Sequence, residues 1–180
     1  MGETEEIRTI NRVLDGDTGA CAGLVATWQA PLIRFLGAML REDRRLAEDL
    51  AQDVFIEAFR RLPDFDSSRS RFSSWLFMMA RSRAINALRK GCPEFVATPP
   101  EVMTPGPPVS ERDDLASLDR AFHRLPADQR RALHLAVVEG LPHHEIAAIE
   151  GVAVGTIKSR VSRARDTLRL SISRDESRKR

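Results

Sequence analysis

The stretch HHEIAAIEGVAVGTIKSRVSRARDTLRL, residues 143–170, carries the clearest structural signal in the chain. Its periodicity predicts a short helix over residues 143–150 and a longer one over residues 154–170. Gly151 is expected to end the first helix as a left-handed cap. Two helices joined in this way form a helix-turn-helix, which requires a small residue where the helices cross, and residues 147–148 are both alanine.

The longer of these two helices has an apolar face and a basic face. Its apolar residues recur at i, i+4, i+7 and i+11, the spacing of one buried stripe: Ile157, Val161, Ala164 and Leu168. The opposite face carries hydroxyl and basic side chains: Thr156, Lys158, Ser159, Arg160, Ser162 and Arg163. Such side chains read base edges in the major groove and bind phosphates. We therefore expect DNA binding here; the alternative is a solvated basic helix in an ordinary bundle.

The rest of the chain also has helical periodicity, and it lacks a convincing strand pattern. The other expected helices span residues 5–14, 18–41, 44–62, 70–90 and 113–124, followed by one that Pro126 opens and Gly140 ends. Pro31 allows either one helix or two over residues 18–41. The predicted fold class is therefore all-α.

A proline-rich segment divides the chain. Residues 91–108 contain six prolines: Pro93, Pro99, Pro100, Pro105, Pro107 and Pro108. Neither helix nor sheet tolerates this density, so the segment predicts an extended, semi-flexible linker between two domains. Charge changes across it as well: residues 91–114 have a net charge of −4 and residues 115–180 a net charge of +5. This asymmetry is typical of a C-terminal domain that binds a polyanion.

An acidic helix is expected before the linker. Residues 42–57 hold six acidic side chains against two arginines. Asp49, Asp53 and Glu57 are spaced by four residues, so they are expected to share one exposed face. Because DNA would repel such a face, we expect it to dock on a basic protein surface. The alternative is an ordinary solvated row of charges.

The helix expected over residues 70–90 is basic, with six Arg or Lys and no acid over residues 67–93. Its predicted core stripe is Phe72, Trp75, Leu76, Met79, Ala80, Ala84, Ala87 and Leu88. Its predicted surface residues are Phe77, Arg81, Ser82, Ile85 and Arg89. The preceding loop, residues 65–71, mixes hydroxyls with arginines and could hold splayed single-stranded bases. The alternative is a helix that merely lacks acids.

The composition narrows the class of protein. With 180 residues and 42% hydrophobic content, the chain suits one or two small domains. No apolar run approaches the roughly 18 residues of a membrane span, and residues 1–10 do not resemble a signal peptide. Cys21 and Cys92 lie far apart, and the histidines lack metal-ligand spacing, so we expect no disulfide framework, metal or cofactor. Catalytic triads, phosphate-binding loops and paired catalytic carboxylates are missing, so we do not expect an enzyme.

Two sets of motifs, one in each half, resemble the extracytoplasmic-function (ECF, group 4) sigma factors of bacterial RNA polymerase. The first set, similar to sigma region 2, is AEDLAQDVF (47–55), FD (65–66), RFSSWLF (71–77), AR (80–81) and AINALR (84–89). The second set, similar to sigma region 4, is LPADQR (125–130), EIA (145–147), VGTIKSRV (154–161) and RAR (163–165). The motifs follow the family's order over residues 10–170.

The resemblance implies a division of the chain into four segments. Residues 1–90 would form region 2, a helical bundle that binds core polymerase and recognises the −10 element. Residues 91–112 would be the linker. Residues 113–172 would form region 4, whose helix-turn-helix recognises the −35 element, and residues 173–180 would be a charged tail.

The resemblance also implies residue roles. The surface for the clamp helices of the largest polymerase subunit would comprise Asp49, Gln52, Asp53 and Glu57. The −10 reader, which captures a flipped base of the melted non-template strand, would comprise Phe65, Ser68, Arg69, Arg71, Arg81, Ser82 and Arg89. The −35 reader would be the basic face over residues 156–163, with Lys158, Ser159, Ser162 and Arg163 toward the DNA.

Two positions depart from relatives. Many relatives have asparagine where this chain has Ser82, so the family's −10 base preference cannot be carried over. Housekeeping sigma factors use an aromatic pair to open the duplex, and here those positions correspond to Met78 and Met79. Methionine stacks on bases less well than an aromatic ring, so we expect weak intrinsic melting and dependence on good −10 and −35 matches.

The expected partners are core RNA polymerase, through its clamp helices and flap, promoter DNA and an anti-sigma factor. We expect a cytoplasmic protein that is not a stable homo-oligomer and that an anti-sigma factor could hold at the inner membrane face. Three rivals remain: an activator with a similar helix-turn-helix, an anti-sigma or adaptor protein, and a small nuclease. The first needs an α/β N-terminal domain, the second lacks a basic recognition face, and the third needs acids beside the basic groove.

Overall fold

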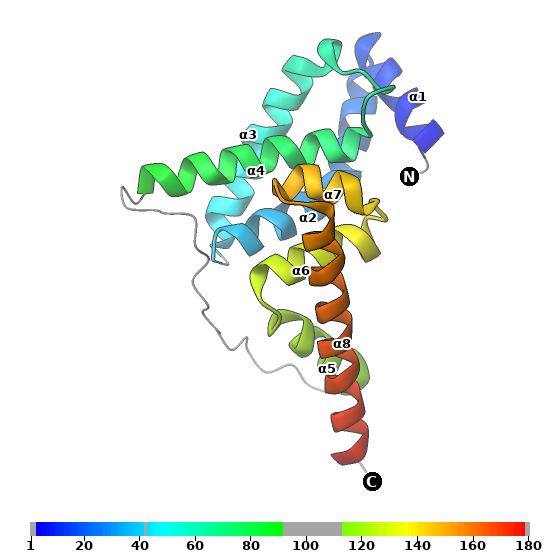
Figure 1. The fold of residues 1–180 in the computed structure, drawn as a ribbon. Coiled ribbons are helices and arrows are strands. Elements are labelled where there is room, and N and C mark those ends of the chain that lie inside the picture. The colour runs from blue at the N-terminus through cyan, green and yellow to red at the C-terminus, as the bar shows by residue number, and fades with distance from the viewer. Residues whose placement is uncertain (1–2, 42, 92–112, 179–180) are drawn as a thin grey trace. The chain divides into compact units, whose positions relative to one another are not determined.

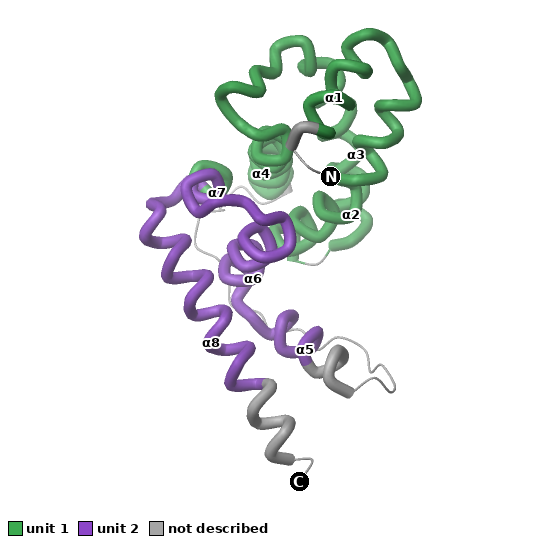
Figure 2. The backbone as a smooth tube through the Cα atoms, turned by 90° about the vertical axis from the view of Figure 1, so that its right-hand side faces the viewer, with its two compact units in different colours: residues 1–95, 148–150 green, residues 96–147, 151–180 purple. Residues whose placement is uncertain are grey.

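The computed structural model describes residues 3–41, 43–91 and 113–178, and all regular structure within these residues is helical (Figure 1). The predicted all-α class is therefore confirmed. The chain divides into two compact units, residues 1–95 with 148–150 and residues 96–147 with 151–180 (Figure 2). Most of the predicted linker lies outside the described residues. No helix within these residues is long and apolar enough to cross a membrane.

The first unit is a bundle around one long helix. Its elements are α1 (Glu3–Leu14), α2 (Thr18–Met39), α3 (Arg44–Arg61), the 3₁₀ turn η1 (Leu62–Asp64) and α4 (Phe72–Gly91). The helix α2 packs against α1, α3 and α4, and α4 also lies across α3 (Figure 1). Of the two predicted alternatives for residues 18–41, a single helix is observed, with Pro31 inside it.

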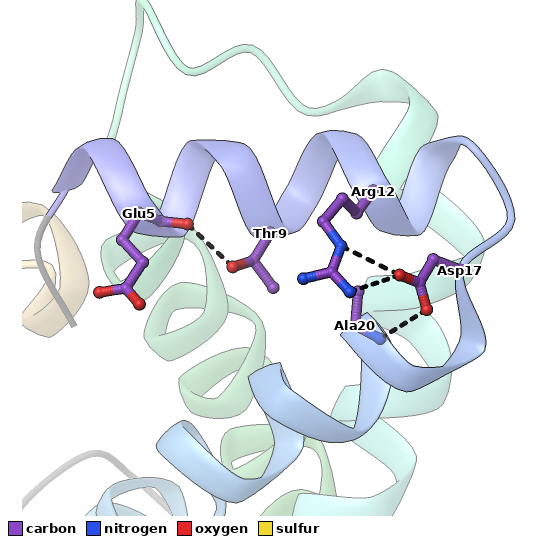
Figure 3. A network of polar contacts seen from close by, with 5 residues as sticks. All are labelled: Glu5, Thr9, Arg12, Asp17 and Ala20. Atoms are coloured by element: carbon purple, nitrogen blue, oxygen red, sulfur yellow. Dashed lines mark hydrogen bonds and ion pairs between the residues drawn. The ribbon is translucent and has the colours of Figure 1, made fainter.

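A charged corner fixes the turn from α1 into α2 (Figure 3). Gly16 adopts a positive φ of 90°, which favours glycine and reverses the chain. Asp17 then caps α2 by accepting a hydrogen bond from the backbone N–H of Ala20 at 3.2 Å. The Arg12 guanidinium donates to the other carboxylate oxygen of Asp17 at 2.6 Å. Hydrogen bonds from Arg12 and Ala20 lower the pKa of Asp17, so the cap stays ionised.

An aromatic cluster forms part of the core of this unit. The ring of Phe77 on α4 lies 5.2 Å from Phe35 and 6.3 Å from Trp28, both on α2, in edge-to-face arrangements. Phe77 is fully buried, so its prediction as a surface residue is wrong. The reason is that α4 packs against two helices at once. Its buried arc is therefore wider than one stripe, and it includes Phe77.

The second unit contains the predicted helix-turn-helix. Its elements are α5 (Asp113–His123), α6 (Ala127–Leu133), the π-helical turn η2 (His134–Val138), α7 (His143–Glu150) apart from its last three residues, and α8 (Val154–Arg178). Both α5 and α6 pack on α8. The predicted stripe is confirmed for Ile157, Val161 and Ala164, which are buried, while Leu168 is half-buried.

Both ends of α6 differ from the sequence prediction. Pro126 stands at the N-cap of α6 and not within its first turn. The helix then widens into η2, where the backbone N–H of Glu139 donates to the carbonyl of His134 at 3.2 Å. The two side chains also meet: the buried Nε2 of His134 lies 3.1 Å from Oε1 of Glu139. Such a π-helical turn is rare and has no signature in apolar spacing.

The turn of the helix-turn-helix follows the sequence prediction. Gly151 caps α7 with φ 64° and ψ 37°, the left-handed conformation that glycine adopts readily. The N–H of Val152 donates to the carbonyl of Ala147 at 3.1 Å, which closes the turn before α8. The helix α8 continues to Arg178, beyond the predicted end at 170, because neither glycine nor proline follows Gly155 to stop it.

Candidate polymerase- and DNA-binding surfaces

One side of α3 is exposed and acidic. Asp43 caps this helix by accepting a hydrogen bond from the N–H of Leu46 at 3.0 Å. The opposite side of α3 is buried through Ala47, Ala51, Val54, Phe55 and Ala58. Asp49, Gln52 and Asp53 are exposed, as the sequence predicted. These three residues form the acidic face of α3.

Sequence reasoning missed an apolar residue in this acidic face. Ile56 follows Gln52 by four residues and Asp53 by three, so it lies on the same side of α3. Its exposed fraction is 69%, which is unusual for isoleucine. A helical wheel could have found it, because Ile56 lies off the buried stripe. The face can therefore offer an apolar contact surrounded by polar ones, the anatomy of a protein interface.

Glu57 lies one helical turn after Asp53 but is not exposed with it, so the predicted exposure of Glu57 is wrong. Its side chain is only 19% exposed and turns toward α4. Oε2 of Glu57 accepts hydrogen bonds from Nε and Nη2 of Arg83 at 2.8 and 2.6 Å, while Arg61 lies 3.5 Å from Oε1. The hydrogen bond from Arg83 lowers the pKa of Glu57, more than burial raises it, and Arg61 lowers it further.

The loop before α4 is held by its own acid and by aromatic packing. Oδ1 of Asp66 accepts hydrogen bonds from the backbone N–H and the hydroxyl of Ser68, at 2.9 and 2.7 Å. These bonds lower the pKa of Asp66. The ring of Phe65 lies 5.8 Å from Phe72 and 5.1 Å from Trp75. Two predicted −10 residues, Phe65 and Ser68, therefore shape the loop internally.

The accessible side of α4 is a narrow stripe. Met78, Ser82 and Arg89 are exposed and Ile85 is half-buried, at the spacing i, i+4, i+11 and i+7 of one helix face. Two predicted −10 residues, Ser82 and Arg89, thus share a face. Arg81 is half-buried beside it. The loop supplies Arg69, which is exposed, and Arg71, which is half-buried.

The predicted DNA face of α8 is only partly free. Lys158, Ser162 and Arg163 are exposed, whereas Thr156 and Ser159 are half-buried. The Ser159 hydroxyl donates to the carbonyl of Thr156 at 2.9 Å. These five side chains lie on the side of α8 away from its buried stripe, and two of them are cationic.

Arg160 is turned into the fold of the second unit. Its Nε lies 2.9 Å from Oδ2 of Asp128 on α6, and its side chain is 20% exposed. Arg160 comes three residues after the buried Ile157, which sets it about 60° from that residue around the helix. The register alone thus indicated a position at the edge of the core. Its prediction as part of the face opposite the stripe is wrong.

Models of two known families match the chain, one in each unit. The model described as Sigma-70 region 2 matches residues 24–91. The model described as Sigma-70, region 4 matches residues 115–168. The ECF RNA polymerase sigma factor RpoE of Cereibacter sphaeroides is 39% identical over 131 residues, which are 71% of this chain and 72% of that relative.

The chain belongs to the ECF sigma factors of RNA polymerase.

Two further comparisons extend over more of this ECF sigma factor. The RNA polymerase sigma-H factor of Pseudomonas aeruginosa is 31% identical and covers 93% of this chain and 94% of its own length. The structure of RpoE from Bartonella quintana, solved with the anti-sigma factor NepR, has a TM-score of 0.59 at 31% identity. It covers 84% of this chain and 96% of its own. The predicted family and two-domain fold are thereby confirmed.

As an alternative sigma factor, the protein is a transcription initiation factor that directs RNA polymerase to a set of promoters. Region 2 corresponds to most of α2 together with α3 and α4, and region 4 corresponds to α5 through most of α8. The acidic face of α3 and the narrow stripe of α4 therefore belong to region 2, and the basic face of α8 belongs to region 4.

Met78, Met79 and Cys21 can be placed in this sigma factor. Met79 is buried, so of the two methionines only Met78 is available at the surface of α4. Cys21 is a half-buried free thiol, and Cys92 lies outside the described residues. Among the residues that the structure describes, no three His, Cys, Asp or Glu side chains gather where they could hold a metal ion.

Proposed function

We propose that this ECF sigma factor uses three separate surfaces: the acidic face of α3 for core polymerase, the loop and stripe of α4 for the −10 element, and α8 for the −35 element. The observation that carries this assignment is the segregation of charge. The exposed carboxylates of Asp49 and Asp53 share the middle of α3, whose exposed arginines are at its two ends, while the exposed cations of α4 and α8 lie on other helices. An acidic face repels DNA and a basic face attracts it, so each surface has one suitable partner.

For core polymerase, Asp49, Gln52 and Asp53 provide polar and charged contacts to a basic partner surface such as the clamp helices of the largest subunit. Ile56 adds an apolar anchor within that face, because its side chain is 69% exposed. Glu57 contributes through α4, since Arg83 occupies its carboxylate. The flap of the polymerase is the expected second contact, made by region 4.

For the −10 element, the loop over residues 65–71 and the stripe of α4 receive a single strand. The packing of Phe65 against Trp75 and the bond from Ser68 to Asp66 keep the loop in shape. Arg69, Arg71, Arg81 and Arg89 surround this region with positive charge that suits phosphates. Ser82 is exposed on the stripe, where it can donate to and accept from a base.

For the −35 element, α8 enters the major groove as the second helix of the helix-turn-helix. Lys158 and Arg163 are exposed cations, and Ser162 and Thr156 supply hydroxyls on the same side. Ser159 lies between Ser162 and Arg163 around the helix. Arg160 contributes to the position of α8 through its ion pair with Asp128.

Both DNA-reading regions are needed together. Each offers few contacts, and joining them on one polymerase makes the second contact effectively intramolecular, which raises avidity. We assign the boundaries 1–90 to region 2, 91–112 to the linker, 113–172 to region 4 and 173–180 to the tail. The protein works as one copy per polymerase and leaves the chemistry of RNA synthesis to that enzyme.

An anti-sigma factor is the proposed regulator. The related RpoE from Bartonella quintana forms a complex with the anti-sigma factor NepR. The exposed apolar and acidic groups of α3 are surfaces that an inhibitor could cover in place of polymerase. Because the polymerase works in the cytoplasm, we assign the sigma factor to that compartment, with retention at the inner membrane face when its anti-sigma factor is membrane-bound.

The test is run-off transcription with purified core polymerase on a promoter library. A set of start sites that depends on this protein is expected; transcription that never depends on it would refute the proposal. Asp53→Arg should abolish binding to core polymerase and leave −35 DNA binding intact, and Arg163→Ala should do the reverse.

The controls for these two variants lie on other surfaces. Asp15→Arg changes the same kind of charge in the turn before α2, and Arg120→Ala removes an exposed arginine from α5, outside the helix proposed to read DNA. Both controls should bind core polymerase and −35 DNA like the wild type. Equal losses of both activities in Asp53→Arg and Arg163→Ala would contradict separate surfaces.

A further inference from the structure

An ion pair joins α3 to α4 across 26 positions of the sequence. Nε and Nη2 of Arg83 donate to one carboxylate oxygen of Glu57, at 2.8 and 2.6 Å. The Glu57 side chain is 19% exposed and that of Arg83 is 40% exposed. Two charge-assisted hydrogen bonds from one guanidinium have a more restricted geometry than a single solvated contact.

The location of this pair relates it to two proposed binding surfaces. Glu57 follows Asp53 of the polymerase-binding face by one helical turn on α3. Arg83 is next to Ser82 of the −10 stripe on α4. The pair is therefore a direct polar link between the helix that would hold polymerase and the helix that would read the −10 element.

Each member of the pair is followed in sequence by a small buried residue. Ala58 follows Glu57 on α3 and Ala84 follows Arg83 on α4; both alanines are fully buried, and the two helices pack against each other. Alanine offers few atoms that interdigitate, so packing of such residues resists sliding or rotation of one helix on another less than larger side chains would. A pair with two directed hydrogen bonds can select one register.

We propose that Glu57 and Arg83 are positioning residues that hold α4 in one register against α3 and so set promoter selectivity. This inference rests on the surfaces assigned under the proposed function. Arg83 then acts by orienting Ser82 and Arg89 and does not itself contact DNA, although it belongs to the basic helix. Glu57 likewise affects promoter choice without contacting the polymerase.

Two other roles for the pair predict different results. If Arg83 contacted DNA directly, loss of Arg83 would weaken binding, whereas loss of Glu57 would free the cation and strengthen it. If the pair only stabilised the fold, its loss would lower the melting temperature and reduce polymerase binding and DNA binding alike. A positioning pair predicts the same loss of selectivity from either side, with polymerase binding retained.

The experiment compares holoenzymes reconstituted from core polymerase and the full chain carrying Glu57→Gln, Arg83→Gln, both changes, or Arg83→Lys. The probe is a labelled fork-junction DNA that carries the −10 sequence of a promoter found by run-off transcription, with a scrambled −10 version as competitor. The readout is the ratio of the two affinities, alongside core polymerase affinity and the melting temperature. Arg61→Gln is the matched control, because Arg61 makes only the 3.5 Å contact with Glu57.

Each single Gln variant should lower the affinity ratio about threefold to tenfold, and the double variant should match either single variant because the pair acts as a unit. Core polymerase affinity should stay within about twofold of wild type. Arg83→Lys keeps the charge but cannot donate the two directed hydrogen bonds of a guanidinium, so it should recover only part of the ratio. Arg61→Gln should stay within about twofold of wild type.

Three results would overturn the proposal: opposite effects of Glu57→Gln and Arg83→Gln, additive effects in the double variant, or an unchanged ratio. A parallel fall of the melting temperature and of polymerase affinity would overturn it in favour of a purely structural pair. The wild-type holoenzyme distinguishes failure of this proposal from failure of the proposed function. If the wild type prefers the −10 sequence and the variants show the same preference, only the positioning role is refuted.

Discussion

In each of the two basic helices of this sigma factor, α4 and α8, one arginine forms an ion pair with an acidic residue on a neighbouring helix. In region 2 the pair is Arg83 with Glu57, and in region 4 it is Arg160 with Asp128. The two helices nevertheless differ in how they are packed. Each packs against two other helices, α4 against α2 and α3 and α8 against α5 and α6, but the buried residues of α4 cover a wider arc than the single stripe of α8.

This difference determines how much of each helix is available to DNA. The buried residues of α4 extend from Met79 through Phe72 and Phe77 to Ser74, about 220° around the helix, and leave the narrower side accessible. The helix α8 instead exposes Lys158, Ser162 and Arg163 on a broad side. A helix that enters the major groove of duplex DNA needs a broad exposed side. A helix that binds a melted strand can share the contacts with the adjacent loop. Basic composition alone does not distinguish the two.

The largest expected effect comes from Phe77→Ala in α4. Phe77 is fully buried against Phe35 and Trp28, so its truncation should lower the unfolding free energy of region 2 by about 3–5 kcal/mol. Urea unfolding followed by tryptophan fluorescence measures this directly. Both tryptophans of the chain, Trp28 and Trp75, lie in the first unit, so the signal reports region 2 within the full chain.

Met78→Ala is the matched control, because Met78 is the next residue and lies on the accessible stripe. Its effect on the unfolding free energy should be below about 1 kcal/mol. If Phe77→Ala were as mild as Met78→Ala, α4 would not be enclosed on two sides, and the contrast with α8 would fail.

The fold was predictable where local rules agree with packing. The left-handed cap at Gly151 and the apolar stripe at residues 157–164 depend only on residues a few positions away. The helices at 143–150 and 44–61 match their predicted bounds closely. Phe77 and η2 were not predicted for a common reason. The width of a buried arc and the widening of a helix depend on which helices pack against it, and that information is not local.

The candidate site was predictable as a set of faces but not residue by residue. Exposure of Asp49, Asp53, Lys158 and Arg163 follows from helical register and charge. Glu57 and Arg160 form ion pairs with residues 26 and 32 positions away in the sequence, so local spacing could not predict their low exposure. Ile56 is the reverse case, since its register indicates exposure while its apolar side chain suggests a core.

A smaller effect is expected from the region 4 pair. Arg160→Met should lower the stability of α8 by about 1 kcal/mol, because the ion pair with Asp128 is partly buried but still reached by water. Hydrogen exchange of the backbone amides of residues 154–171 measures it. Asp128→Asn should have a similar effect, and the double variant should add little to either.

Arg163→Met on the same helix sharpens the comparison, because Arg163 is exposed. Its effect on hydrogen exchange should stay within about 0.5 kcal/mol, while it weakens −35 binding more than Arg160→Met does. Should Arg160→Met weaken −35 binding more at unchanged protection of α8, Arg160 would be a DNA contact after all, and the parallel with Arg83 would break.

The smallest effect concerns the pH dependence of the region 2 pair. Hydrogen bonding from Arg83 lowers the pKa of Glu57 below its ordinary value of 4.5. A lowered pKa in the folded state means that the ionised carboxylate stabilises the fold above pH 4.5, and that this stabilisation disappears as the pH falls through the folded pKa. At pH 7, Glu57→Gln should therefore lower the unfolding free energy by less than about 1 kcal/mol.

The difference between the wild type and Glu57→Gln should narrow as the pH falls from 7 to below 4.5, because protonated Glu57 and glutamine are then both neutral partners for Arg83. Urea unfolding followed by tryptophan fluorescence at several pH values measures this change. The same comparison in an Arg83→Gln background should lose most of its pH dependence, since the chief cause of the lowered pKa is gone. If this difference widened on acidification, the titration of another group would dominate the pH dependence of stability. The ion pair of region 2 would then not act through the ionised carboxylate of Glu57.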